Sequence, residues 1–271
     1  MTRLHAVFIA LAASTLASCS STPQRPRAAL PVTVSAPAPA SVPVDPGQVL
    51  LARLQQLAPG ADPGVLALAL EARACAVASG AAEADSRLTV IDYSRPSSER
   101  RLWVFDLAEA RLLFNEHVSH GQGSGGHYAT RFSNVEGSFA TSLGLFRTAE
   151  TYVGGNGYSL RMDGLDPGFN DNARMRAIVM HGAWYANPDL IRSQGRLGRS
   201  QGCPALREGI ARQVIDSIKG RQLVFSYADD AEWLSRSRHF GCTSGRSARQ
   251  ILADARGLRG AGLPVVAVAA P

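Results

Sequence analysis

The sequence predicts a mainly β fold with inserted helices, in which an antiparallel, sandwich-like domain is flanked by N-terminal and C-terminal helices. Three observations support this prediction. Short apolar segments rich in β-branched residues alternate with turns that contain Gly and Asn between residues 88 and 227. Apolar residues recur at helical spacing on both sides of this region. The chain has 271 residues and is 45% hydrophobic, which is enough to bury a core.

Residues 1–18 have the pattern of an export signal. Arg3 carries a positive charge, the apolar run that follows is too short to cross a bilayer, and small residues lead up to Cys19. Leu16-Ala17-Ser18-Cys19 resembles the lipobox of bacterial lipoproteins, which implies that Cys19 becomes the acylated first residue of the mature chain. Ser20 resembles the sorting pattern for the outer membrane, so we expect a lipoprotein at its periplasmic face. An ordinary cleaved signal with an unmodified Cys19 is the alternative.

Residues 19–47 are rich in Pro, Ala, Ser and Val and carry few charges. Such a segment cannot bury enough apolar area to offset its ordering entropy, so we predict an extended tether. A tether suits an anchored protein that must reach away from its membrane. A simple spacer has the same composition and is the alternative.

Residues 48–86 are expected to form a helical hairpin around Pro59-Gly60. Leucines at positions 50, 51, 54 and 57 precede this turn at helical spacing, and apolar residues at 66, 70 and 77 follow it in the same way. We expect the hairpin to pack on the next domain. A helix pair that binds a partner protein is the alternative.

Residues 87–228 are expected to form the central domain, with short strands separated by turns. The predicted strands are Leu88–Tyr93, Arg101–Leu107, Arg111–Val118, Phe139–Arg147, Tyr158–Met162, Arg176–Met180 and Gln222–Tyr227. Residues 229–271 form a C-terminal extension, with helices predicted at 231–234 and 246–258. Its last ten residues are small and apolar but too few to span a membrane.

The stretch from His181 to Cys203 carries the predicted chemistry. A buried strand delivers His181-Gly182 at its end, a Gly-rich loop follows, and Cys203 comes just before residues at helical spacing. The thiolate of a Cys is its nucleophilic form, so a reactive Cys requires a base or a positive field nearby. We predict that His181 is the base, and that Pro204 begins a helix whose positive end lies next to Cys203.

Two further features of this stretch fit acyl transfer. Gly202 permits a close backbone approach, so the amides near Cys203 are candidates for an oxyanion hole. Either a carbonyl in the His181-Gly182 turn or the Ser200 hydroxyl is expected to hold the imidazole in the correct tautomer. Taken singly, an inert buried Cys and a surface His are the simpler interpretations.

His181-Gly182 followed by Ser200-Gln201-Gly202-Cys203 resembles the His...Ser/Thr-x-Gly-Cys motif of the YkuD-type L,D-transpeptidases, bacterial enzymes that remodel peptidoglycan. The resemblance extends in order over about residues 88 to 227 and is strongest to a subgroup described as murein L,D-transpeptidase catalytic domain proteins. The segments that carry it are Ile91-Asp92-Tyr93-Ser94, Val118-Ser119-His120-Gly121, Arg131-Phe132-Ser133-Asn134, Ser159-Leu160-Arg161, His181-Gly182-Ala183-Trp184-Tyr185 and Gly198-Arg199-Ser200-Gln201-Gly202-Cys203-Pro204. Gln201 departs from the motif because many members have His there, and Pro204-Ala205-Leu206 replaces a segment that often carries Arg or Asn.

The resemblance implies an L,D-transpeptidase whose Cys203 forms a thioester with a tetrapeptide stem of peptidoglycan and passes it to an amine acceptor. An L,D-carboxypeptidase or endopeptidase that hydrolyses the same intermediate is one alternative, and a non-catalytic wall-binding lipoprotein is another. The resemblance also implies substrate contacts, although ordinary structural hydrogen bonding would suit the same residues. The residues concerned are His120, Arg131, Ser133, Asn134, Arg161, Tyr185 and Arg199.

Other ligands are not expected. The Gly-rich run 121–126 lacks the Gly-Lys-Ser/Thr of a phosphate loop, and His117, His120 and His127 lack a carboxylate or Cys that would complete a metal set. We therefore predict no cofactor and no metal. The net charge of +6 suits an acidic polymer or anionic headgroups, whereas nucleic acid is not expected because no basic, aromatic-studded motif occurs and the chain carries an export signal.

Four cysteines occur in the chain. Cys19 is assigned to lipidation and Cys203 to catalysis, which leaves Cys75 and Cys242 in the flanking segments. In an oxidising compartment these two can form a disulfide between the N-terminal helices and the C-terminal extension. Two free thiols are the alternative, since the sequence does not define their separation.

Overall fold

The computed structural model describes residues 45–84 and 87–260. The predicted export signal, Cys19, the predicted tether up to residue 44 and the tail from residue 261 lie outside the described residues. Within the described ranges, no helix has both the length and the apolar character needed to cross a membrane.

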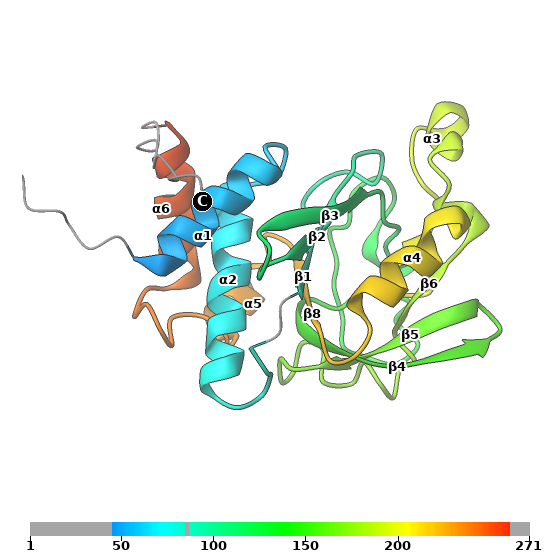
Figure 1. Ribbon diagram of the computed structural model, residues 1–271. Coiled ribbons are helices and arrows are strands. Elements are labelled where there is room, and N and C mark those ends of the chain that lie inside the picture. The colour runs from blue at the N-terminus through cyan, green and yellow to red at the C-terminus, as the bar shows by residue number, and fades with distance from the viewer. Residues whose placement is uncertain (1–44, 85–86, 261–271) are drawn as a thin grey trace, which may run out of the picture. The chain divides into compact units, whose positions relative to one another are not determined.

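The described strands form one eight-stranded sheet in the order β3-β2-β1-β8-β4-β5-β6-β7 (Figure 1). The strands are β1 Arg87–Asp92, β2 Leu102–Asp106, β3 Arg111–Glu116, β4 Gly144–Gly154, β5 Gly157–Gly164, β6 Val179–Gly182, β7 Ala205–Leu206 and β8 Leu223–Tyr227. Neighbouring strands are antiparallel except for the parallel pairs β1–β8 and β6–β7. The prediction of a mainly β domain with inserted and flanking helices is confirmed.

The described part of the chain contains six α-helices, of which α1, α2 and α5 begin at an Asp cap. They are α1 Pro46–Leu57, α2 Pro63–Ala78, α3 Asp189–Gln194, α4 Glu208–Ile218, α5 Ala231–Arg236 and α6 Ala248–Gly260, with short 3-10 turns η1 Gln122–Ser124 and η2 Trp184–Ala186. Asp45 and Asp62 accept hydrogen bonds from the first turns of α1 and α2, and Pro occupies the next position in both. Because Asp45 and Pro46 start α1, the helix begins two residues before the predicted start of the hairpin at residue 48.

The terminal helices pack on one another. α2 lies against α6, and a disulfide joins Cys75 of α2 to Cys242 in the loop before α6. Their Cα atoms are 5.7 Å apart, a separation that suits a disulfide. Glu71, one turn before Cys75, accepts hydrogen bonds from the residues that follow Cys242. The C-terminal extension is therefore tied to the N-terminal helical hairpin.

Helix α4 packs against strand β6, where Figure 1 shows the two side by side. Gly182 allows this approach, because a Cβ atom there would lie 3.0 Å from the Cβ of Ala211. Arg207 precedes α4 and forms a two-pronged ion pair with Glu116 at the end of β3. The helix therefore fixes the end of the strand that carries His181.

Two predicted strands are displaced in the structure. The strand predicted from Phe139 begins only at Gly144, and the strand predicted at 176–180 occupies Val179–Gly182. Phe139 and Ala177 have positive φ angles of 50° and 52°, so neither residue can continue a regular strand. Strand β7 was not predicted, because two residues are too few to show a periodic pattern.

Candidate active site

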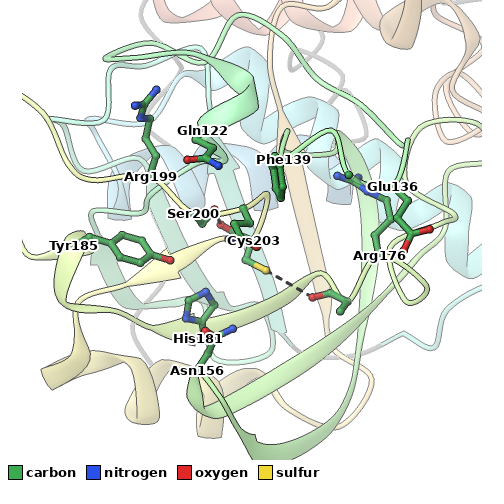
Figure 2. A pocket seen from close by; sticks show the side chains of 13 residues that line it. Gln122, Glu136, Phe139, Asn156, Arg176, His181, Tyr185, Arg199, Ser200 and Cys203 are labelled. Atoms are coloured by element: carbon green, nitrogen blue, oxygen red, sulfur yellow. Dashed lines mark hydrogen bonds between the residues drawn. The ribbon is translucent and has the colours of Figure 1, made fainter.

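Cys203 and His181 line the same pocket, which has a volume of approximately 590 Å³ (Figure 2). Strand β6 supplies His181, and Cys203 lies two residues before β7, the neighbouring strand in the sheet. The pocket is lined by Gln122, Glu136, Gly137, Phe139, Asn156, Arg176, Ala177, His181, Tyr185, Arg199, Ser200, Gln201 and Cys203.

The Cys203 side chain is buried, with 8% of the residue's surface exposed. Its sulfur accepts a hydrogen bond from the backbone N–H of Val179 at 3.4 Å and lies 3.7 Å from the carbonyl oxygen of Ala177. Burial raises the pKa of the Cys203 thiol, while the Val179 amide and the charge of Arg176 act in the opposite direction. The net shift is upward, so the resting residue is a neutral thiol near neutral pH and requires a base.

The prediction that Pro204 begins a helix is wrong. Ala205 and Leu206 form β7, and α4 begins only at Glu208. Residues 205–206 pair in parallel with His181-Gly182, and this pairing keeps the chain extended after Cys203. Since the effect of a helix dipole is concentrated at the first turn, the N-terminus of α4 does not lie next to the sulfur as the sequence had suggested.

His181 has the geometry of a neutral base. Its Nδ1 atom is 2.9 Å from the carbonyl oxygen of Gly182. A carbonyl only accepts, so Nδ1 carries the proton and donates it to this bond, which leaves the Nε2 lone pair as the basic position. Burial lowers the pKa of His181, which favours the neutral ring. The ring of Tyr185 meets the imidazole edge-on, with centroids 6.4 Å apart.

Ser200 shapes the turn that holds Cys203. Its hydroxyl donates to the carbonyl oxygen of Cys203 at 2.6 Å and accepts from the N–H of Gly202 at 3.1 Å. Of the two proposed orienting groups, the Gly182 carbonyl therefore contacts the imidazole, and the Ser200 hydroxyl is occupied within its own turn. This turn also receives a hydrogen bond from Thr141 Oγ1 to the Gly202 carbonyl.

Gly202 is required by the backbone of this turn. Its φ is +120°, and a Cβ atom there would lie 2.9 Å from the carbonyl oxygen of Ala140. The N–H of Gly202 is already used by Ser200, so it is not free to bind a substrate oxygen. Within the described part of the chain the N–H of Cys203 has no such partner, which makes it the candidate oxyanion donor.

His120, expected to contact substrate, lies behind the pocket instead. The residue is fully buried, and its Nδ1 is 2.8 Å from Nη2 of Arg101, which is also fully buried. Burial and the adjacent Arg101 lower the pKa of His120 to about 3, so the ring is neutral. The backbone carbonyl of His120 accepts from the Ser200 N–H at 3.0 Å, so this residue supports the loop that carries Cys203.

Four other predicted contacts do not line the pocket. Arg131 is exposed, and Arg161 forms an ion pair with Glu150 on β4. Ser133 and Asn134 serve the neighbouring loops: the Ser133 carbonyl accepts from Arg176, and the Asn134 side chain donates to Asp171. Tyr185 and Arg199 do line it, and burial raises the pKa of Tyr185 to about 12.

Several residues that line the pocket were not predicted as site residues from the sequence. They are Gln122, Glu136, Gly137, Phe139, Asn156, Arg176, Ala177 and Gln201. Gln122 lies in the Gly-rich run 121–126, and this run is a usable signal for a loop near the site. Arg176 was assigned to a buried strand, so its place beside the nucleophile had no signal in the sequence.

One cluster of potential metal ligands occurs among the described residues. Glu71, Cys75 and Cys242 bring a carboxylate and two sulfurs within 4.8 Å of one another. Because the two sulfurs form the disulfide, this cluster offers no thiolates to a metal ion. It also lies outside the residues that line the pocket.

A thiol and a neutral imidazole in one pocket define the class of site that nucleophilic acyl transfer requires. The model of the L,D-transpeptidase catalytic domain matches residues 57–227, which is more than half of the chain. The chain belongs to this family, whose members act on the stem peptides of peptidoglycan.

Solved structures resemble the chain weakly. An L,D-transpeptidase from Mycobacterium smegmatis is 16% identical, with 53% of this chain and 59% of that chain covered and a TM-score of 0.33. An L,D-transpeptidase from Stackebrandtia nassauensis is 13% identical over 60% of this chain and 68% of that chain, with a TM-score of 0.34. The helical cell shape determining protein Pgp2 from Campylobacter jejuni is 12% identical over 66% of this chain and 71% of that chain, with a TM-score of 0.36.

These similarities are too low to add to the family assignment. The chain spans less than two thirds of the Mycobacterium smegmatis protein. No curated protein matches the sequence.

Proposed function

We propose that this protein is a peptidoglycan L,D-transpeptidase with Cys203 as its nucleophile and His181 as its base. The observation that carries the proposal is the shared pocket of these two residues, in which the Gly182 carbonyl leaves Nε2 of His181 free to accept a proton. Family membership supports the substrate class, a peptide bond between an L-centre and a D-residue in a tetrapeptide stem.

The proposed reaction has two half-reactions. In the first, the Cys203 thiol gives its proton to Nε2 of His181 while the sulfur attacks the carbonyl carbon of the stem. The resulting oxyanion is stabilised by the Cys203 amide. When the carbon–nitrogen bond breaks, the departing D-amino acid takes the proton from His181 and a thioester remains.

In the second half-reaction an acceptor amine attacks the thioester. His181 takes a proton from the attacking nitrogen, a new amide forms, and the sulfur leaves as a thiolate that recovers the proton. Each group of the enzyme returns to its starting state. No step requires electron transfer. His181 and Cys203 are therefore sufficient to carry the proton and the acyl group through both half-reactions.

Arg199 and Tyr185 are proposed to bind the stem peptide. Both side chains line the pocket, and Figure 2 shows Arg199 and Tyr185 at separate parts of its rim. Arg199 is exposed and donates from Nη1 to the Gly125 carbonyl at 3.0 Å, so its other N–H groups are available to a carboxylate. Peptidoglycan stems carry such carboxylates.

The test is incubation with purified muropeptides followed by mass analysis. Transfer predicts cross-linked products whose mass equals donor plus acceptor minus the released amino acid. Shortened stems alone would indicate a carboxypeptidase or endopeptidase, in which water replaces the amine. The matched control is Cys203→Ala: cross-links vanish if the thiol is the nucleophile, whereas a non-catalytic wall-binding protein would bind murein equally well with either residue. Unchanged muropeptides with folded wild-type protein contradict the enzyme proposal.

We also propose that the chain is exported and anchored in the outer membrane, facing the periplasm, through lipid on Cys19. The lipobox-like residues and the Pro-rich segment after them support this proposal. Cells expressing the full chain should incorporate labelled palmitate and place the protein in the outer-membrane fraction. Cys19→Ala should abolish the label, while absence of label from the wild-type protein would refute lipidation.

A further inference from the structure

The buried thiol of Cys203 lacks the electrostatic aid that thiol enzymes commonly take from a helix N-terminus. Burial raises its pKa, and α4 begins five residues later. One backbone amide, that of Val179, donates to the sulfur. Some other positive group near the sulfur would therefore have a large effect on how readily it ionises.

Arg176 is such a group, and it is held rigidly. Its Nη1 donates to the Ser133 carbonyl at 2.7 Å and to the Ser142 hydroxyl, and its Nη2 donates to the Ala140 carbonyl at 2.8 Å and to the Ser138 hydroxyl at 3.2 Å. All four terminal N–H bonds are thus used, and every acceptor is neutral. Across the described residues Arg176 has no ion-pair partner, so its charge is not neutralised by a carboxylate.

Arg176 also lies beside the nucleophile. It lines the pocket together with Cys203, and Figure 2 shows both side chains around the same cavity. Its Nη2 is 3.5 Å from the position that a Cβ atom on Gly202 would take, one residue before Cys203. The positive charge of Arg176 lowers the pKa of Cys203 against the effect of burial.

We propose that Arg176 is a positioning residue for the nucleophile, whose fixed charge stabilises the thiolate of Cys203 and the negative charge that develops during attack. Its terminal N–H groups are occupied by the protein, so it acts through its charge and leaves the binding of substrate carboxylates to groups such as Arg199. The significance of this role for turnover rests on the proposed function. The electrostatic role itself does not.

The other charged or titratable groups around Cys203 differ from Arg176 in their electrostatic effect on the thiol. Glu136, His181, Tyr185 and Arg199 line the pocket, and the fully buried Tyr93 interacts electrostatically with Cys203. The raised pKa values of Tyr93 and Tyr185 keep both phenols neutral at physiological pH. Arg199 is not among the groups that shift the pKa of Cys203, which distinguishes the two pocket arginines.

The test measures ionisation of Cys203 without requiring turnover. Full-length protein is alkylated with iodoacetamide across pH 5 to 10, and the modified fraction is read by mass spectrometry on the tryptic peptide that spans residues 200–207. Arg176→Gln should raise the midpoint of the rate profile by roughly one pH unit, which is a tenfold smaller thiolate fraction below that midpoint. Arg176→Met is a second neutral variant, and thermal unfolding checks that each protein is folded.

Two variants separate charge from hydrogen bonding. Arg176→Lys keeps the positive charge but loses the two-pronged hydrogen bonding of the guanidinium. Its alkylation midpoint should therefore lie close to that of the wild type. Arg174→Gln is the matched control, since Arg174 is two residues away and is paired with Glu150 and Asp163; it should leave the midpoint unchanged. Neutral variants with the wild-type midpoint, or a Lys variant shifted by a full unit, would overturn the proposal.

The two proposals fail in different ways. A shifted alkylation midpoint with no action on muropeptides would retain the role of Arg176 and reject transpeptidation. Cross-linking with an unshifted midpoint would retain transpeptidation and reject the role of Arg176.

Discussion

The backbone N–H of Val179 points to the sulfur of Cys203, 3.4 Å away. This contact follows from the parallel register in which His181 pairs with Ala205, because Val179 and Cys203 each lie two residues earlier. The same register carries the imidazole and the thiol into one pocket. The catalytic pair therefore depends on a strand pair only two residues long.

The loss of activity at acid pH should follow the protonation of His181. Burial lowers the pKa of this imidazole below its ordinary value of about 6.5, and a base must be unprotonated to work. We expect kcat/KM to fall as pH decreases, with a midpoint below about 6.5, because His181 stays neutral to a lower pH than a free imidazole. The measurement is a pH profile of muropeptide cross-linking from pH 4.5 to 8. His181→Asn should lose most activity at every pH, and an acid midpoint above 7 would contradict the lowered pKa.

Substitution of Gly202 should damage the Cys203 turn. Gly202→Ala introduces a Cβ 2.9 Å from the Ala140 carbonyl at a φ of +120°. We expect a loss of about 1–3 kcal/mol in the free energy of unfolding and a loss of cross-linking activity. Urea denaturation and the muropeptide assay measure the two effects.

The control is Gly209→Ala in α4, where a Cβ would meet only Nη1 of Arg207 at 3.6 Å. Alanine suits a helix, so this variant should be as stable as the wild type or slightly more stable. Equal stability of the two variants would show that the turn tolerates a side chain.

The Cys75–Cys242 disulfide should stabilise the helical additions. The two residues are 167 positions apart, so the cross-link restricts a long segment of the unfolded chain. Replacing both by Ala should lower the free energy of unfolding by about 2–5 kcal/mol in urea. Dithiothreitol should destabilise the wild type by a similar amount and leave the double variant unchanged. A wild-type protein that is insensitive to the reductant would argue against the bond.

His120 should make the protein sensitive to acid. Its pKa is about 3 in the folded state and about 6.5 when unfolded, so only the unfolded state takes up the proton between these values. The free energy of unfolding should therefore fall as pH drops from about 6.5 toward 3, by up to about 1.4 kcal/mol per pH unit from this residue. Stability curves at pH 4, 5 and 6 for wild type and His120→Gln measure it. The variant should be less stable at pH 7 but lose less stability with acid, and equal slopes would exclude His120 as the cause.

Much of the fold could be predicted from local patterns. Capping by Asp62 and the Pro at the next position mark the start of α2, and short runs of mostly apolar residues mark β1 and β8. These signals are visible because they depend on neighbours in sequence. The displaced strand near Ala177 had no such signal, since a positive φ at an Ala is imposed by packing and not by its side chain.

The site divides in the same way. Cys203, His181 and Gly202 are recognisable by residue type and spacing, and they are together in the structure. Ser133 and Asn134 have side chains suited to binding substrate but bond to loops instead. Whether a polar side chain meets substrate or protein depends on which loop lies opposite, and loops that are distant in sequence supply that partner.

The sequence by itself determined which residues supply the thiol, the imidazole and the conformationally permissive glycine, namely Cys203, His181 and Gly202. It also determined most of the strand and helix pattern around them. Only the tertiary structure decided that Cys203 precedes a strand and not a helix, that His120 turns inward to Arg101, and that Arg176 lies beside the nucleophile. The physical reason is the distance along the chain over which each property is determined. Residue chemistry and periodicity are local properties, whereas strand register, burial and the field at a sulfur atom are set by groups brought together across long stretches of the chain.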